Sequence, residues 1–396
     1  MSRAIVCGAG IAGLSLSWWL ERHGWEVVVV ERAPELHGGG YMIDFFGSGY
    51  DAAELMGLLP RLSAVAYDVT EIAYVDDRGR PASRLGYDTF RQLQAGRVLS
   101  MMRGDLEQVL ATALGDRVEI RFSRSIAAVT QARDHVTVTL TDGTAERADL
   151  LVGADGIHSR VRELVFGPER AFLRDLGYHT AAYVFRAPTV WERLAGGFRI
   201  RSVPGRQAGY YPLRDGRVAS FHAHASGGAA VPDDPRAALR RGYADLGWVV
   251  PDALAHCPPP PALYYDTVAQ IEMPAWSHQR VTLVGDACQA VSLLAGQGAS
   301  LAMGGAYVLA DELARSRDVA VALAGYERRV KSTAQRTQAA GRRAADWFVP
   351  ATSRRIAMRD LALRVAALPG LRGLLRPVLT TSAGSIVPRR PDARPT

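Results

Sequence analysis

A glycine-rich run close to the N-terminus has the residue types and spacing of a nucleotide-binding turn. Residues 8–13 read GAGIAG, a G-x-G-x-x-G between an apolar run and a helical pattern. Its glycines permit a tight turn, close approach of the backbone to a pyrophosphate and close packing of helix on strand. Glu31 ends the next apolar run, where its carboxylate can accept hydrogen bonds from a ribose hydroxyl. We therefore predict a dinucleotide site, with an ordinary glycine turn as the alternative. Its residues are Gly8, Gly10, Ala12, Gly13 and Glu31.

Two later segments share one arrangement, an apolar run that leads directly into glycine and aspartate. The run at 150–152 leads into GADG, and the run at 281–284 leads into GD, with GQG following at 296–298. An aspartate at such a junction can bind a ribityl hydroxyl, and the amides of the GQG run can bind a flavin carbonyl. Two such junctions beside one dinucleotide fingerprint favour FAD over NAD. The residues assigned to the flavin are Asp155, Gly156, Asp286, Gly296, Gln297 and Gly298.

The elements that must position these motifs alternate between strand and helix. The unbroken valine run at 27–30 indicates a strand buried on both faces, as in a parallel sheet. Short apolar strands are expected beside each motif, at 4–7, 27–30, 150–152 and 281–284. Alternating segments are expected to be antiparallel strands, at 118–121, 125–130 and 135–140. A helix is expected at 11–23 and a much longer one at 301–345.

The sequence changes in character between about 171 and 270, where aromatic strands separated by turns predict an inserted sheet. These strands are expected at 178–186, 198–203, 209–213 and 218–224. Four prolines at 258–261 form a stiff connector, interpreted as the return to the first domain. The predicted fold class is α/β, a Rossmann-like FAD-binding domain with an inserted, mainly antiparallel β-sheet substrate domain and C-terminal helices. The predicted boundaries are 1–70, 96–170 and 271–345 for the FAD-binding domain, 71–95 and 171–270 for the substrate-binding domain, and 346–396 for the C-terminal helices and tail.

In combination these motifs resemble the single-component FAD-dependent aromatic hydroxylases, the family of para-hydroxybenzoate hydroxylase and the tetracycline-inactivating monooxygenases. The matches are the fingerprint with Glu31 and Arg32, both aspartate junctions, and the run MRGDL at 102–106. In that run the family has an arginine that opens a helix near the FAD ribose and pyrophosphate. The resemblance therefore implies that Arg103 contacts FAD and that Asp286 binds the ribityl chain.

The resemblance also implies an activity. In the family, NAD(P)H reduces FAD, O₂ adds at the flavin C4a, and the resulting hydroperoxide transfers oxygen to an electron-rich ring. The protein excludes water and holds the ring within reach. No second G-x-G-x-x-G is present, which fits transient binding of NAD(P)H. We expect an FAD-dependent monooxygenase that hydroxylates a phenolic or polycyclic aromatic small molecule. A flavin-dependent oxidase, reductase or epoxidase, or a non-catalytic flavin-binding protein, is the alternative.

Two positions depart from the family pattern. Gln289 and Leu293 stand where relatives often carry His and Pro. Because a glutamine amide does not titrate, a proton relay through that histidine has no counterpart at Gln289. The departures leave the FAD-binding motifs intact.

Three residues of the inserted sheet are candidates for contact with substrate. Arg186 ends a predicted strand where several relatives place an arginine facing the flavin, and a surface arginine is the alternative. Tyr211 and His222 lie on neighbouring strands and could form the aromatic floor of a pocket, with core packing as the alternative. His222 and His224 share one face by strand alternation, but no third ligand is evident and no metal is expected. Asp44 either lies near the flavin or is a solvated loop acid.

Composition narrows the remaining classes. The chain has 396 residues, with 47 Lys+Arg against 40 Asp+Glu, a formal net charge of +7. No run of five or six like charges is present, and the densest clusters are arginine pairs, so we expect solvated surface arginines rather than a nucleic-acid-binding surface. Three widely spaced cysteines without a CxxC pair fit a reducing cytoplasm. The sequence has no uninterrupted stretch of 18 apolar residues, so no membrane span is expected. The arginine-rich segment 356–379 is expected to pack over the FAD domain, with a membrane-surface helix as the alternative, and the tail after Val387 is expected to be disordered.

Overall fold

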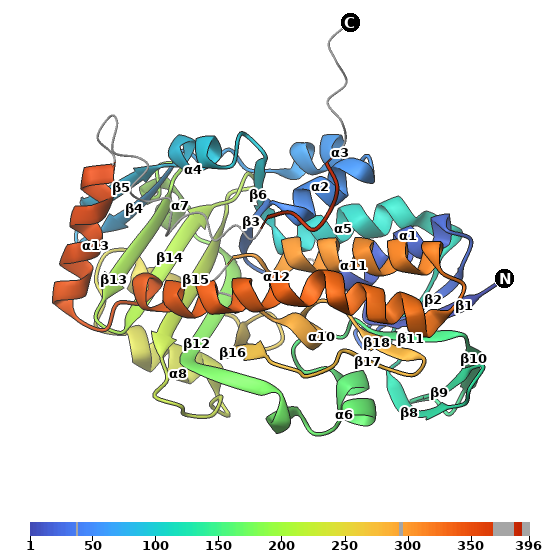
Figure 1. Ribbon diagram of the computed structural model, residues 1–396. Helices are drawn as coiled ribbons and strands as arrows, with labels where there is room; N and C mark the ends of the chain where they lie inside the picture. The colour runs from blue at the N-terminus through green and yellow to red at the C-terminus, as the bar shows by residue number, and fades with distance from the viewer. Residues whose placement is uncertain (37–38, 293–295, 367–383, 390–396) are drawn as a thin grey trace, which may run out of the picture.

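A six-stranded sheet carries the glycine fingerprint and both aspartate turns (Figure 1). The computed structural model describes residues 1–36, 39–292, 296–366 and 384–389. The strand order is β17-β18-β11-β1-β2-β7, and all neighbours are parallel except β17 and β18. The strands are β1 (Arg3–Cys7), β2 (Glu26–Val30), β7 (Glu119–Arg121), β11 (Leu150–Gly153), β17 (Ser277–His278) and β18 (Val281–Leu283). Residues 27–30 are all buried, as the valine run predicts.

The edge strand β7 corrects one expectation. It pairs parallel with β2, whereas its alternating sequence suggested an antiparallel strand. The alternation arises because an edge strand is partly exposed, and exposure carries no information on strand direction. The antiparallel pairing expected for the next two segments is present in a separate three-stranded sheet, ordered β10-β9-β8. Its strands are β8 (Ile126–Gln131), β9 (Val136–Leu140) and β10 (Ala145–Ala148).

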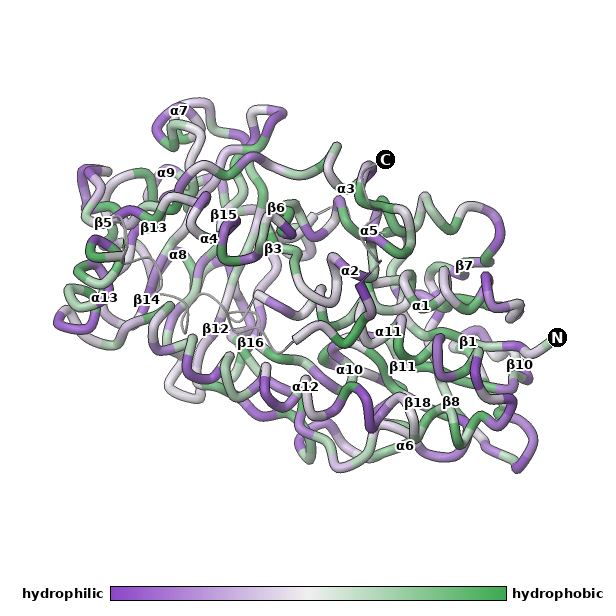
Figure 2. The backbone as a smooth tube through the Cα atoms, turned by 45° about the horizontal axis from the view of Figure 1, so that its top comes forward, coloured by the Kyte–Doolittle hydropathy of each residue, from purple (hydrophilic) through white to green (hydrophobic). Residues whose placement is uncertain are grey.

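Helices cover the six-stranded sheet and bury its apolar side chains. In Figure 2 hydrophobic residues gather along central strands such as β11, while the outer turns are hydrophilic. The long helix expected at 301–345 is in fact two helices, because Asp318 caps a new N-terminus by accepting from Ala320 N–H at 2.9 Å. The main covering helices are α1 (Ile11–Arg22), α5 (Arg103–Leu114), α11 (Gly298–Arg315) and α12 (Val319–Phe348). Shorter helices are α2 (Ser48–Leu55), α3 (Leu59–Val65), α4 (Tyr87–Leu93), α6 (Arg160–Phe166) and α10 (Asp286–Gln289), with 3₁₀ turns η1 (Gly115–Arg117) and η2 (Glu169–Ala171).

A seven-stranded sheet forms the other large layer, in the order β16-β12-β15-β14-β13-β4-β5. All neighbours are antiparallel except β13 and β4. The strands are β4 (Glu71–Val75), β5 (Pro81–Gly86), β12 (Leu173–Arg186), β13 (Phe198–Val203), β14 (Arg206–Pro212), β15 (Arg217–Ala225) and β16 (Tyr264–Ile271). The proline connector at 258–261 therefore leads into β16 of this same sheet, and its interpretation as the return to the first domain is wrong. The exact domain boundaries stay a prediction.

The two faces of the seven-stranded sheet have different neighbours. One face packs against α7 (Pro188–Arg193), α8 (Pro235–Tyr243) and α9 (Val250–Ala255). The other face, which includes Phe221, packs against Tyr41 and the end of α12. A two-stranded antiparallel sheet of β3 (Met42–Phe46) and β6 (Val98–Met102) lies beside this second face, where Met102 contacts Tyr211. The second face is thus the one that looks toward the six-stranded layer.

The last described helix, α13 (Ser353–Ala366), packs on β5 and β13 rather than over the FAD domain as expected. Its Arg359 points inward, fully buried, with the guanidinium 3.5 Å from the centre of the Tyr74 ring. Met358 and Leu361 are exposed. The rest of the predicted helical segment, 367–379, and most of the predicted disordered tail lie outside the described residues. Within the part of the chain that the structure describes, no helix is long and apolar enough to cross a bilayer.

Candidate functional site

The three fingerprint glycines have different reasons to be glycine. Gly8 has φ +108°, and a Cβ there would lie 2.5 Å from the carbonyl oxygen of Ala154. A Cβ on Gly13 would lie 1.9 Å from the Gly8 carbonyl oxygen, so Gly13 lets α1 pack on the turn. At Gly10 the nearest atoms would be side-chain atoms of Glu107 and Arg103, at 3.5 and 3.8 Å. The protein itself therefore has room for a side chain at Gly10, and a glycine there leaves space for a ligand.

Glu31 braces the fingerprint turn from the end of β2. Its Oε2 accepts from Ala9 N–H at 2.7 Å, and its Oε1 accepts from Ala33 N–H at 2.8 Å. Each carboxylate oxygen keeps a second acceptor site, so ribose hydroxyls can still bind. Arg32 is exposed beside it.

Arg103 opens α5 at the far side of Gly10. Its Nη2 lies 2.7 Å from the Oε1 of Glu107, a buried carboxylate one turn along the helix. Burial raises the pKa of Glu107, and the guanidinium of Arg103 opposes that shift. The Arg103 side chain is 35% exposed, so the ion pair fixes one edge of the guanidinium while other N–H groups remain accessible.

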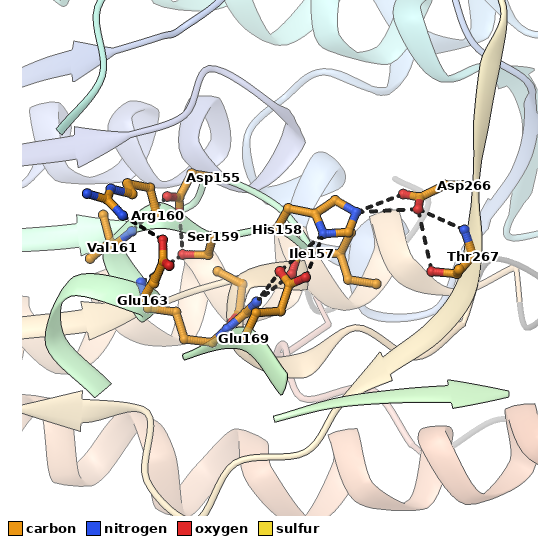
Figure 3. Close-up of polar contacts among 12 residues, drawn as sticks. Asp155, Ile157, His158, Ser159, Arg160, Val161, Glu163, Glu169, Asp266 and Thr267 are labelled. Carbon is orange, nitrogen blue, oxygen red and sulfur yellow. Dashed lines mark hydrogen bonds and ion pairs between the residues drawn. The ribbon is translucent and has the colours of Figure 1, made fainter. Parts of the chain in front are cut away.

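Asp155 is engaged within its own turn. Its Oδ1 accepts from Ser159 Oγ–H at 2.5 Å and its Oδ2 from Val161 N–H at 3.0 Å. Ser159 Oγ in turn accepts from Arg162 N–H at 3.0 Å, which caps α6 (Figure 3). Gly156 follows with φ +80°, a conformation that favours glycine. The aspartate thus shapes the turn.

Asp286 is the opposite case. It begins α10 directly after Gly285, whose φ is +66° and whose Cβ would lie 2.7 Å from the side chain of Ala12. Its carboxylate is solvent-accessible and makes no hydrogen bond to the residues that the structure describes. Desolvation by the surrounding protein raises the pKa of the carboxyl, and the charge of Arg103 opposes that shift. Asp286 is thus an available acceptor within electrostatic reach of Arg103.

The GQG run lies beside this aspartate. Gly298 is the first residue of α11, and its Cβ position would be 3.7 Å from Asp286 Oδ1. The first amides of a helix have no partner within the helix and carry its positive dipole end. Gln297 stands at the N-cap position but makes no side-chain hydrogen bond to the helix, and Gly296 is exposed with φ +65°. These amides can therefore bind an electronegative group.

Two tyrosines in this region were missed by sequence reasoning. Tyr41 precedes β3 and Tyr264 begins β16, and their ring centres are 6.0 Å apart. Burial raises the pKa of Tyr41 to about 12, with Arg103 opposing and Asp286 reinforcing the shift. The tyrosines therefore lie within reach of both Arg103 and Asp286. They are far apart in sequence, and only the aromatic pair at 264–265 offered a local signal.

Of the two positions that depart from the family pattern, the structure describes only Gln289. Gln289 is buried, and its Nε2 donates to Leu301 O at 3.4 Å, so the amide packs against α11. Leu293 lies outside the described residues.

The three substrate candidates do not lie together. Tyr211 lines a cavity of about 220 Å³ with Tyr67, Trp191 and Phe198, and its hydroxyl accepts from Met42 N–H. Arg186 is exposed at the end of β12, on the sheet edge beside the turn at 214–217. The structure gives it no contact with the FAD-site residues.

His222 needs a correction. It is fully buried on the α8 and α9 face, 3.1 Å from the Tyr210 hydroxyl, and adjacent strand residues point to opposite faces. It therefore cannot share a pocket floor with Tyr211, which pairs with Ala219 and packs on the other face of the sheet. Burial, with His224, lowers the pKa of His222 to about 3. Asp44 is also not a solvated loop acid, because it lies in β3 and accepts from Ser100 Oγ–H at 2.8 Å.

Together the site offers what a flavin dinucleotide needs. It has a glycine turn with space at Gly10, an accessible guanidinium at Arg103, and, at Asp286 and at the start of α11, a carboxylate and a Gly298 amide without hydrogen-bond partners among the described residues. These donors and acceptors come from four segments that are far apart in the chain. The residues present therefore fit FAD.

Comparison with known proteins agrees with this geometry. The sequence matches the family described as FAD binding domain over residues 1–340. The Mycobacterium tuberculosis protein MT1298 is 36% identical over 352 residues, which cover 85% of this chain and 92% of that protein. A flavin-dependent monooxygenase from an unknown prokaryotic organism is 32% identical over 346 residues, which cover 86% of this chain and 88% of that protein. The crystal structure of the tetracycline destructase Tet(55) matches with a TM-score of 0.80 at 26% identity, over 98% of this chain and 99% of that one.

The family match spans most of the chain, and the related monooxygenase is more than 30% identical. The fold class and the resemblance inferred from the motifs are confirmed. The chain belongs to the FAD-binding-domain family, with FAD as its cofactor, and is a flavin-dependent monooxygenase.

Proposed function

We propose that this monooxygenase uses NAD(P)H and O₂ to hydroxylate a phenolic or polycyclic aromatic small molecule. The observation that carries the proposal is the aromatic wall beside the FAD site. The ring of Tyr41 lies 6.0 Å from that of Tyr264 and 6.2 Å from that of Phe221, on the sheet face that looks toward Asp286. Aromatic side chains favour offset or edge-to-face contacts with an aromatic ligand.

In this proposal the protein's own residues hold and orient FAD. Arg103 donates to the phosphate or ribose oxygens, with Glu107 fixing the guanidinium. Asp286 accepts from a ribityl hydroxyl, and the α11 amides at Gly298 donate to a carbonyl of the ring system. FAD bound at these residues would supply the redox chemistry that connects NAD(P)H with O₂.

Substrate is held by the aromatic wall and oriented by hydroxyl groups in this proposal. Tyr211 accepts from Met42 N–H, which leaves its own O–H for an oxygen of the substrate. Burial raises the pKa of Tyr211, so this hydroxyl stays protonated and acts as a donor. The apolar surroundings exclude water from the reacting atoms. The name of the related tetracycline destructase supports a polycyclic substrate class.

The working compartment is proposed to be the cytoplasm. Cys7, Cys257 and Cys288 are all buried free thiols, as in proteins that work under reducing conditions.

The proposal is tested with purified FAD-loaded protein and a panel of aromatic metabolites. Flavin reduction by NADH and by NADPH is followed at the flavin absorbance, and products are examined by mass spectrometry under ¹⁸O₂. We expect one class of aromatic ligand to accelerate flavin reduction and to gain one ¹⁸O atom. Nicotinamide oxidation without labelled product would favour the oxidase or reductase alternative. A flavin that NAD(P)H never bleaches, whatever the ligand, would favour a non-catalytic role.

A further inference from the structure

A chain of polar contacts connects the two aspartate turns with the seven-stranded sheet (Figure 3). Arg162 is its fully buried centre. One terminal nitrogen of Arg162 donates to Ala287 O at 3.0 Å, directly after Asp286. The other donates to Ile157 O at 2.7 Å and to Glu169 Oε2 at 3.0 Å. Arg162 thus joins the turn that follows β11 to the turn that follows β18.

His158 extends this chain to the sheet. Its Nδ1 lies 3.1 Å from both carboxylate oxygens of Glu169, and its Nε2 lies 3.1 Å from Asp266 Oδ2 in β16. Asp266 is held in turn, because its Oδ1 accepts from Thr267 N–H at 2.7 Å. In Figure 3 the imidazole points between the two carboxylates. One ring therefore bridges a turn of the FAD-binding layer and a strand of the other sheet.

This bridge requires a charged imidazole. An ionised carboxylate is an acceptor only, and a neutral imidazole has one N–H, whereas an imidazolium has two. Only the charged ring can donate to Glu169 and Asp266 together. The contact with Asp266 is the main cause that raises the pKa of His158 to about 9; burial opposes it, and Glu169 adds to it.

The other charged groups nearby are already paired. Arg162 shares Glu169 with His158, and Arg160 pairs with Glu163 on α6 at 2.6 Å. His158 is 45% exposed, so the bridge contributes little to global stability. Its effect is on geometry. Asp266 contributes to the pKa of both Tyr41 and Tyr264, so its carboxylate lies within electrostatic reach of the aromatic wall.

We propose that His158 is a positioning residue for the FAD site, an imidazolium bridge that holds the Asp155–Gly156 turn in register with β16. This inference rests on the proposed placement of FAD against Arg103, Asp286 and Gly298. Loss of the proton to solvent frees one of the two carboxylates, and the turn is then tied to the sheet on one side only. FAD is held less firmly in that state.

The experiment measures FAD release from the loaded protein by the recovery of flavin fluorescence, between pH 7 and pH 10.5. The variants are His158→Gln and Asp266→Asn. Matched controls are His135→Gln and Asp134→Asn, because His135 and Asp134 form an exposed pair at 2.7 Å in the turn between β8 and β9. The release rate of the unmodified protein is expected to rise about two- to fivefold with a midpoint near pH 9, an effect of the size expected for half-exposed ion pairs.

The variants sharpen this expectation. His158→Gln is expected to release FAD at the faster rate throughout, with no midpoint. Asp266→Asn keeps an acceptor for the ring but removes one charge, so its midpoint is expected at lower pH. Both controls are expected to follow the unmodified protein. The titration of His158 is measured separately by NMR, and circular dichroism checks that each variant is folded.

Several outcomes would overturn the proposal. One is a flat release profile across the pH at which NMR shows His158 losing its proton, and another is an ordinary histidine pKa for His158. A third is His158→Gln behaving as the unmodified protein, and if that variant does not fold, Asp266→Asn with an unshifted midpoint decides the same way. Asp286→Asn separates the two levels of failure. If Asp286→Asn leaves FAD release unchanged, the placement of FAD is wrong. If Asp286→Asn speeds FAD release but the variants of His158 and Asp266 do not, only the bridge is rejected.

Discussion

The two aspartate turns look alike in sequence and differ in structure. Both follow a buried strand of the six-stranded sheet, yet Asp155 has both oxygens bonded within its own turn, while Asp286 has neither bonded to a described residue. The same contrast separates Gly13, whose space the protein itself occupies, from Gly10, whose space it leaves open. A motif residue can therefore shape the fold or await a ligand, and its hydrogen-bond partners tell which.

The largest expected effect separates the two glycines. Gly13→Ala places a Cβ 1.9 Å from the Gly8 carbonyl oxygen, so the backbone must move. We expect loss of soluble folded protein or a destabilisation above about 4 kcal/mol, measured by urea unfolding of the FAD-free chain.

Gly10→Ala is its matched control, because its nearest atoms lie 3.5 and 3.8 Å away. We expect folding stability within about 1 kcal/mol of the parent and FAD binding weakened by about 1–3 kcal/mol, the usual cost of forcing a methyl group into a filled site. Unchanged FAD binding by Gly10→Ala would contradict the contrast between the two glycines.

The pH dependence of stability tests the buried histidines of the seven-stranded sheet, which contact no described residue of the FAD site. Burial lowers the pKa of His222 to about 3, and burial with His179 lowers that of His224 to about 4. The unfolded chain, with histidine near pKa 6.5, then binds more protons than the folded chain, so stability is lost as pH falls below about 6.5. Between pH 7 and pH 5 we expect a loss on the order of 2 kcal/mol per histidine, measured by urea unfolding. Equal stability at both values would refute this expectation, and His222→Gln should reduce the pH dependence.

Asp286→Asn tests whether this aspartate serves the ligand rather than the fold. Removing the charge weakens hydrogen bonds to the ligand by about 1.5–3 kcal/mol, so FAD affinity should fall roughly tenfold to a hundredfold. The FAD-free protein should unfold as the parent does, because this carboxylate makes no hydrogen bond to a described residue. Isothermal titration with FAD and thermal unfolding without it measure the two effects. A large loss of stability would place Asp286 among the residues that shape the fold.

Asp155→Ala should have the reverse effect of Asp286→Asn, and a smaller one. It should lower stability and change FAD affinity little. Loss of this capping contact is expected to cost about 1–2 kcal/mol of stability, with FAD affinity reduced about fivefold or less as the turn loosens. The matched control is Asp234→Ala, which removes a similar cap from α8, where Asp234 accepts from Ala237 N–H at 2.9 Å. Both variants should unfold at similarly lowered temperatures. A fall in FAD affinity as large as that of Asp286→Asn would show that Asp155 is a ligand-binding residue.

Most of the fold could be predicted from local sequence patterns. The G-x-G-x-x-G between strand and helix, the valine run of β2 and the four strands expected in the inserted sheet all depend on short-range spacing, and each lies within a few residues of its expected place. The sheet's other strands, β4, β5 and β16, were not expected. The direction of β7 and the destination of the proline connector depend on which distant strand is the neighbour. Alternation and composition do not report that choice.

The site shows the same limit. His158 and Asp266 are 108 residues apart, and Tyr41 and Tyr264 are even farther apart in the chain, so no local spacing could join either pair. The placement of His222 was within reach, because strand alternation puts it on the face opposite to Phe221. The difference between Asp155 and Asp286 could not be predicted in this way, because it depends on the hydrogen bonds that Ser159 and Val161 donate to Asp155 and that no described residue donates to Asp286.

The parallel pairing of β4 with β13 bears on synthesis at the ribosome. β4 ends at Val75 and its partner begins at Phe198, so its edge stays unpaired while the intervening residues are made. At about 5–20 residues per second that interval lasts roughly 6–25 s, and the far edge strand β16 follows later still. The nascent chain therefore exposes a strand edge for much longer than a hairpin needs to close. Slower translation between these strands should raise the demand for chaperones, whereas the same delay after β18, the last strand that the structure describes, should not.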